Sequence, residues 1–132
     1  MIGAAPLRVP ASPKLGSWLQ GQNHSLACST YRANRLILVG TAPAEQKRPG
    51  EPVQLKLHER LFDRPMGLFL AAESLWMASR CQIWRFDNLL GPGQSHEGGD
   101  RLFVPAAAFT TGDVNAHEVV FGPDGQPIFV NA

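Results

Sequence analysis

Apolar residues along the chain follow two different strand patterns. The run 36–39 is apolar at every position and ends at Gly40, which predicts a strand buried on both faces. Val53, Leu55 and Leu57 instead alternate with polar residues, the pattern of a strand with one face in solvent. Gly and Pro are frequent between such runs and predict turns there. The chain is therefore expected to be all-β.

The strand pattern begins three times along the sequence. Repeats of roughly 40–50 residues built from short strands are typical of the blades of a β-propeller. We therefore predict a partial β-propeller of two to three blades built from antiparallel meander strands. Its predicted boundaries are about 25–65 for blade one, about 66–114 for blade two and about 115–132 for the start of blade three.

The segments outside these strands are expected to differ in structure. Residues 1–14 contain three prolines and predict an irregular leader before an incomplete propeller domain at 15–132. Within 15–22, Leu15, Trp18 and Leu19 have the spacing of a short amphipathic helix, which we expect to cover one hydrophobic surface. A strand at 102–104 is expected to end before a proline, and the alanine-rich residues 106–109 are too few to nucleate a helix.

In the third repeat, residues 123–125 predict a hairpin turn in which Gly125 supplies the positive φ, and the strand 127–131 that follows reaches the end of the sequence. A propeller needs at least about four blades to close its ring, so this chain is expected not to complete one by itself. The outer edge of the last strand is apolar and predicted to be unpaired. Such an edge favours self-association through exposed strand edges.

Composition and charge exclude two classes of partner. The 132 residues carry a net charge of +1 without a basic stripe, and the densest basic pair, Lys47-Arg48, is interpreted as part of a solvated loop. We therefore expect no nucleic-acid partner. No apolar run approaches the roughly 18–20 residues that span a bilayer, so no membrane partner is expected either.

Two cysteines are too few for a disulfide framework. Cys28 and Cys81 each lie in an apolar strand pattern, where a free cysteine behaves as a small buried hydrophobe. We predict two reduced core thiols, with a disulfide or a reactive thiol as the alternatives. Reduced thiols favour a cytoplasmic location.

No complete catalytic or nucleotide-binding motif is present in the sequence. It has no phosphate-binding glycine loop, no Cys-x-x-Cys pair and no Gly-x-Ser-x-Gly elbow. The candidate ligand-binding residues lie at the start of blade three, where polar groups of a propeller can line its central channel; they are Asp113, His117, Glu118 and Asn131. Together they offer ligands for a hard divalent cation or a polar molecule. The alternative is a structural role in which His117 bonds to a neighbouring loop, and whether any metal binds stays open.

Arg80 and Arg85 flank an aromatic strand of blade two. They are expected to form ion pairs between blades with Asp63, Asp87 or Asp100. Directed into the channel, either arginine could instead hold an anionic ligand through a bidentate contact, so Arg80 joins the candidate ligand-binding residues.

Three aromatic residues of blade two are expected to pack between blades. Trp84 and Phe86 share one face of their strand because side chains alternate along it, and Trp76 belongs to the preceding strand. We interpret all three as packing residues and not as a ligand cage.

An ordered series of short motifs resembles a known family. The series runs through 62–67, 75–80, 82–86, 100–105, 110–113, His117-Glu118 and 129–131. It resembles a bacterial family of conserved hypothetical proteins, a domain of unknown function expected to form a β-propeller, over about residues 18–131. Relatives in this family are longer and continue beyond the last motif, which implies that this chain is a truncated member. Ala106 and Ala107 stand where the family often has a basic residue, which weakens an anion site there.

The resemblance implies a fold and leaves the chemistry open. We expect an uncharacterised propeller-type binding or scaffold protein, more consistent with a non-enzyme than with an enzyme, and we predict no cofactor. Its ligand would be a small molecule or a protein. The alternative is a fragment of a metal-dependent propeller hydrolase, resembling the lactonase-like enzymes, in which a channel metal activates water.

Overall fold

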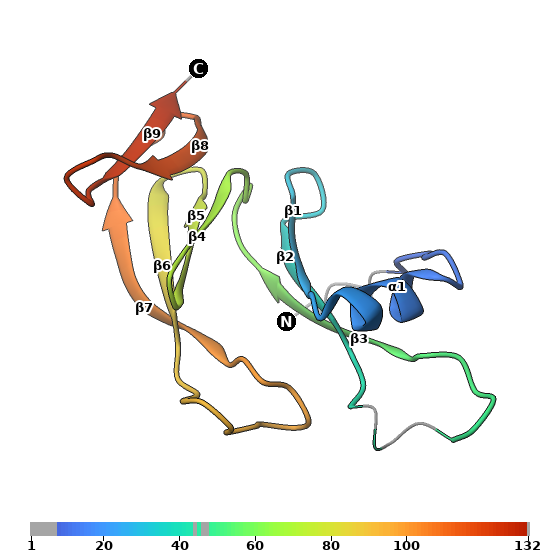
Figure 1. Cartoon of the computed structure of the whole chain (residues 1–132). Coiled ribbons are helices and arrows are strands. Elements are labelled where there is room, and N and C mark those ends of the chain that lie inside the picture. The colour runs from blue at the N-terminus through green and yellow to red at the C-terminus, as the bar shows by residue number, and fades with distance from the viewer. Residues whose placement is uncertain (1–7, 44, 46–47, 132) are drawn as a thin grey trace.

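Nine strands and one helix follow one another along the described residues 8–43, 45 and 48–131 of the computed structural model (Figure 1). The elements are α1 (Leu15–Gln22), β1 (Leu26–Thr30), β2 (Arg35–Thr41), β3 (Leu55–Leu61), β4 (Leu68–Ala71), β5 (Ser74–Ala78), β6 (Gln82–Asn88), β7 (Phe103–Thr110), β8 (Ala116–Phe121) and β9 (Pro127–Asn131). Residues 1–7 of the predicted leader and Lys47 of the basic pair lie outside the described residues. No helix within the described ranges is long and apolar enough to cross a membrane.

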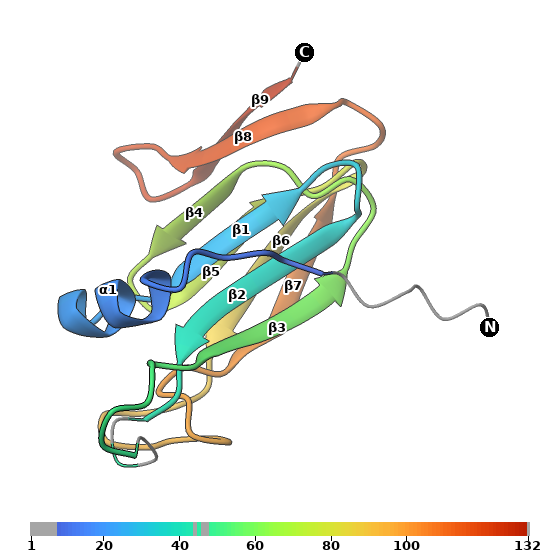
Figure 2. The same cartoon turned by 90° about the vertical axis from the view of Figure 1, so that its right-hand side faces the viewer.

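The strands form three antiparallel sheets, each continuous in sequence. Sheet one has the order β1-β2-β3, sheet two β4-β5-β6-β7 and sheet three β8-β9. Figure 2 shows sheet one in front of sheet two, with the β8–β9 hairpin at the top of the molecule. The predicted all-β class is confirmed, and these open, stacked sheets are consistent with a partial propeller.

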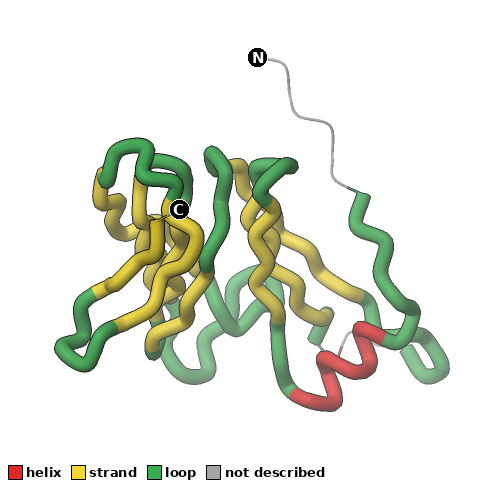
Figure 3. Tube along the Cα trace, turned by 90° about the horizontal axis from the view of Figure 1, so that it is seen from above, coloured by secondary structure: helices red, strands yellow, loops and turns green. Residues whose placement is uncertain are grey.

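Sheet one is built around the continuous apolar run of β2, which the sequence predicted to be buried on both faces. Leu36 of β2 is turned toward sheet two, whereas Ile37 and Val39 are turned toward α1. Helix α1 lies on the outer side of the strands (Figure 3) and buries Leu19 against Ile37 and Val39. The predicted helix is confirmed with the same bounds, but Trp18 is 56% exposed because only the Leu19 side of this short helix meets the sheet.

Sheet two contains one strand, β7, that is longer than the sequence pattern predicted. β7 does not end before Pro105 but continues through it to Thr110, so the expected strand end was wrong. β7 is the outermost strand of sheet two, where the missing N–H of a proline removes no ladder hydrogen bond if it faces away from β6. The register also shifts between Arg85 and Phe86, opposite this proline, which accommodates its ring.

Sheet three is a two-stranded hairpin with a defined turn. The amide of Gly125 donates to the carbonyl of Gly122 at 3.0 Å, and the amide of Gly122 donates to the carbonyl of Gln126 at 2.9 Å. Gly125 has φ of 72°, the left-handed conformation that closes such a three-residue loop. The sequence prediction of a hairpin turn with positive φ at Gly125 is confirmed.

Two apolar clusters lie between the sheets and hold the stack together. Between sheets one and two, Leu36 packs with Met77 and Phe86. Between sheets two and three, Trp76 packs with Ile83 and Val119. Trp84 borders the first cluster, so the prediction that Trp76, Trp84 and Phe86 are packing residues is confirmed, and their packing lies between sheets.

The cysteines differ from their predicted burial. Both are free thiols, as predicted, but Cys28 is exposed and Cys81 is half-buried, so the prediction of two core thiols was wrong. Cys28 pairs with Ile37 across sheet one and shares its face. The helix that covers Ile37 does not extend over the Cys28 side chain, since α1 packs against β2.

Candidate functional site

One end of the molecule collects the turns and connections that carry most of the candidate residues. We call it the loop end, at the top of Figure 1, and define it by residues 31–34, 62–67, 79–81 and 111–115. These four segments are tied to one another by backbone contacts. The amide of Phe62 donates to Asn34, the amide of Arg80 to Asp63 and the amide of Thr111 to Cys81. The loop end is therefore a continuous hydrogen-bonded surface across sheets one and two.

Arg80 bridges two of these segments through its side chain. Its Nε donates to Oδ2 of Asp113 at 2.8 Å, and its Nη1 lies 3.8 Å from Oδ2 of Asp63. Asp63 lies in the connection into sheet two and Asp113 in the connection into sheet three. The pKa of Arg80 is raised above its ordinary value, first by the hydrogen bond to Asp113 and then by the charges of Asp113 and Asp63. Arg80 thus stays charged and links both connections to the β5–β6 turn.

A second set of contacts fixes the connection between sheets one and two. Oδ1 of Asn34 accepts a hydrogen bond from the amide of Arg64 at 3.0 Å. The guanidinium of Arg64 lies 5.7 Å from the ring centre of Tyr31, within the range of a cation–π contact. Asn34 has φ of 55°, a left-handed conformation that asparagine adopts more readily than most residues.

His117 occupies a β-bulge next to this end. β8 pairs with β9 through Ala116 with Asn131 and through Glu118 with Val130, which leaves His117 as the extra residue. Bulges of this kind redirect side chains and often lie near functional sites. The imidazole is half-buried and makes no hydrogen bond to another residue in the described part of the chain.

The backbone at His117 presses against the start of β4. A Cβ built on Gly67 would lie 2.5 Å from Cα of Glu118 and 2.8 Å from the carbonyl oxygen of His117. Only glycine allows two backbones to approach so closely. Gly67 therefore sets the distance between sheets two and three beside the bulge.

The other candidate residues are less closely grouped. Glu118 and Asn131 are exposed, and neither side chain has a polar partner among the described residues. Within the described ranges, no three His, Cys, Asp or Glu side chains are grouped so that they could hold a metal ion. The structure brings Arg80 and Asp113 into contact and places His117 and Asn131 at one end of sheet three. It does not gather the five candidates into one coordination sphere.

Both arginines form ion pairs, but the pair of Arg85 lies within a single strand, so the prediction of an ion pair between blades was wrong for Arg85. Arg80 contacts Asp63 as expected, and Asp113, which the sequence had assigned to the ligand site. Nε of Arg85 lies 3.2 Å from Oδ1 of Asp87 on its own strand, a charge contact without the alignment of a hydrogen bond. Asp100 makes no ion pair with a described residue.

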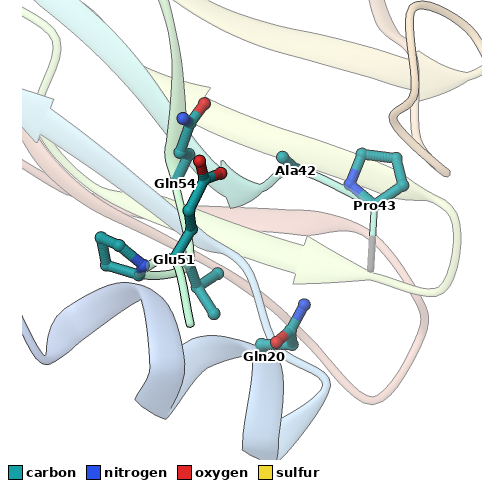
Figure 4. A pocket seen from close by; sticks show the side chains of 7 residues that line it. Gln20, Ala42, Pro43, Glu51 and Gln54 are labelled. Atoms are coloured by element: carbon teal, nitrogen blue, oxygen red, sulfur yellow. The ribbon is translucent and has the colours of Figure 1, made fainter. Parts of the chain in front are cut away.

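A small hollow opens between α1 and the connection before β3 (Figure 4). Gln20, Glu51 and Gln54 supply its polar side chains, beside Ala42 and Pro43. Its volume is about 100 Å³. Pockets for drug-sized ligands have volumes of about 300–1,000 Å³, so this hollow offers little room for one.

The sequence did not reveal two features of the site. The double contact of Arg80 depends on two connections meeting at one turn, and no local pattern encodes that meeting. The close approach at Gly67 had a weak signal, since a glycine at the start of a strand often marks a neighbouring backbone.

Comparisons with known proteins identify a family without an assigned activity. Comparison with curated proteins and with solved structures found no match. A protein-family model matches residues 13–132, which is nearly the whole chain. The chain therefore belongs to the family described as a domain of unknown function, DUF4915.

Proposed function

We propose that the chain is a non-catalytic binding or scaffold module of propeller type that presents its loop end to a ligand or partner. The contact that carries this proposal is the bridge from Arg80 to Asp63 and Asp113. The carboxylates of Asp63 and Asp113 both contact Arg80 and so hold the connections into sheets two and three at the β5–β6 turn. They therefore stabilise the polar surface of the loop end. His117 lies beside this surface with an unpartnered imidazole in the described structure and is the side chain best placed to contact a ligand.

A metal-dependent hydrolase draws less support from the same residues. Such a site needs several ligands around one point and a position for water. Asp113 is bound to Arg80, whereas Glu118 and Asn131 are exposed. His117, Glu118 and Asn131 would still offer an incomplete ligand set, so the hydrolase is the outcome against which the proposal is tested.

We also propose a cellular location and a class of partner for the module, from its free thiols and its net charge. We propose a cytoplasmic location, because both described cysteines are free. A net charge of +1 without a basic stripe supports a partner other than nucleic acid. Self-association through strand edges is a further proposal, supported at the outer edge of sheet two by the absence of charged residues from β7.

A thermal-shift experiment separates the binding module from the hydrolase. The melting temperature of the chain is measured with and without calcium, magnesium, manganese and zinc chlorides. His117→Ala is compared with His58→Ala, an exposed histidine on β3 remote from the loop end. We expect no ion to raise the melting temperature of any of the three proteins. An ion that stabilises the wild type and His58→Ala but not His117→Ala would favour the hydrolase.

A further inference from the structure

Two arginines of the loop end have no carboxylate partner. The loop end contains three arginines and two aspartates, and both aspartates contact Arg80. All eleven Asp and Glu residues of the chain lie within the described ranges, and none of them forms an ion pair with Arg32 or Arg64. The positive charge at these two arginines is therefore not balanced by an ion pair.

The Arg64 side chain has a defined position although it forms no ion pair. Its guanidinium lies over the Tyr31 ring, 5.7 Å from the ring centre, and the residue is half-buried. This guanidinium makes no hydrogen bond to a described residue. Because a ring contact uses the face of the guanidinium, its N–H groups remain available as a planar fork that matches a carboxylate or a phosphate.

The backbone of Arg64 adopts a conformation that is unfavourable for this residue. Its φ is 49°, in the left-handed region that bulky side chains rarely adopt. The next residue is Pro65, and a proline favours extended backbone in the residue before it. The amide of Arg64 donates to Oδ1 of Asn34 at 3.0 Å, which holds this conformation. Residues held in such conformations are frequent at ligand sites, and here the residue is an arginine without an ion pair.

The segment that follows Arg64 is fixed to both neighbouring sheets. Pro65 is fully buried. The hydroxyl of Ser29, on sheet one, donates to the carbonyl of Met66. The amide of Met66 donates to the carbonyl of Ala78, on sheet two, at 2.9 Å. Arg64 therefore projects from a rigid backbone, and a site of this kind loses little conformational entropy when a ligand binds.

We propose that Arg64, supported by the Tyr31 ring, binds an oxyanion at the loop end, namely the carboxylate or phosphate group of a small molecule. This inference rests on the proposed function as a binding module and names the charge of its ligand. The guanidinium donates two parallel N–H···O hydrogen bonds to the anion. The positive charge of Arg32, in the same turn as Tyr31, adds to the attraction.

The neighbouring charged groups are compatible with an anion at Arg64. Asp63 precedes Arg64, but Nη1 of Arg80 lies 3.8 Å from its Oδ2 and offsets its charge. Arg80 also donates from Nε to Asp113 at 2.8 Å, so both of its contacts are to carboxylates of the chain itself. The anion contact that the sequence suggested for Arg80 is therefore better supported at Arg64.

An NMR titration of the isotope-labelled full chain tests the inference. Sodium phosphate and sodium acetate are added in separate experiments, and sodium chloride keeps the ionic strength constant. We expect saturable shifts of the backbone amides at 31–34 and 62–64 with at least one of the two anions. The anion with the higher affinity identifies the ligand group as a phosphate or a carboxylate.

Two variants of Arg64 separate binding from folding. Arg64→Asn removes the guanidinium and places a residue that tolerates the left-handed conformation at φ of 49°, so the fold should be kept. Its affinity for the anion should fall roughly tenfold or more. Arg64→Lys keeps the charge without the planar fork and should also weaken binding. Arg48→Asn is the matched control, because Arg48 is exposed in the β2–β3 connection, away from the loop end (Figure 1), and it should bind like the wild type.

Three results would overturn the inference. They are no saturable shift at the loop end with either anion, shifts that sodium chloride alone reproduces, and undiminished affinity in both Arg64 variants. Failure of the inference is distinguishable from failure of the proposed function, because the thermal-shift comparison tests metal ions at His117 and does not involve Arg64.

Discussion

Replacing Gly67 by alanine places a methyl group where sheets two and three touch. The new Cβ would lie 2.5 Å from Cα of Glu118, 2.8 Å from the carbonyl oxygen of His117 and 2.8 Å from the amide nitrogen of Val119. All three neighbours are backbone atoms, so no flexible side chain can move aside. Gly67 is not among the glycines with positive φ, so the cost is steric and not conformational.

The magnitude follows from the cost of overpacking. Extra methyl groups in a packed region cost about 1–3 kcal/mol, and backbone neighbours favour the upper end of that range. The loss of chain entropy in the unfolded state on changing glycine to alanine offsets about 0.4–1 kcal/mol. We therefore expect Gly67→Ala to lower the free energy of unfolding by about 2 kcal/mol.

Gly40→Ala is the matched control. Its added Cβ would meet only Oγ of Ser25 at 3.6 Å, an ordinary contact, on a buried strand of the same protein. Urea unfolding followed by tryptophan fluorescence measures both variants, and we expect Gly40→Ala to stay within about 1 kcal/mol of the wild type. If Gly67→Ala lost no more stability than Gly40→Ala, the close packing of β8 on the start of β4 would be refuted.

Three further predictions test the helix, the core and the thiols. Gly16→Ala would place a Cβ against the backbone just before β3, so it should lower the stability of the chain in urea. The Cβ of Gly21→Ala would meet nothing within 4 Å, so this variant should stabilise α1 by up to about 1 kcal/mol. Equal effects of the two variants would contradict the docking of the helix on sheet one. Met77→Ala removes a side chain with 0% exposure and should cost about 2–5 kcal/mol in the same assay, so a loss below about 1 kcal/mol would place Met77 outside the core. Cys28 should react with a thiol reagent faster than Cys81 in the native chain, as mass spectrometry of timed samples can measure; faster labelling of Cys81 would reverse the observed exposures.

Local patterns predicted the elements whose environment is set by their own side chains. The helix Leu15–Gln22 and the buried strand β2 could be predicted from apolar spacing alone. The spacing in the helix indicates one buried face, and the continuous apolar run of β2 indicates two. The turn at Gly125 follows from the conformational freedom of glycine. These elements required no knowledge of the neighbouring sheets.

The features that the sequence did not predict depend on contacts between distant segments. The exposure of Cys28 depends on how far α1 extends over sheet one, and the continuation of β7 depends on its place at the sheet edge. The bridge from Arg80 to two connections depends on three segments meeting at the loop end. A strand pattern specifies which side chains alternate, but it does not specify which face another sheet will cover.

Residue-resolved amide hydrogen exchange across β8 and β9 of the full chain tests most directly the claim that these strands form a hairpin with the register described above. The account predicts slow exchange at Ile128 and Val130, whose amides face β8, and fast exchange at Phe129, whose amide faces outward. Equal protection of all three amides would contradict the alternating hydrogen bonds of this ladder. Equally fast exchange of all three would contradict the hairpin itself.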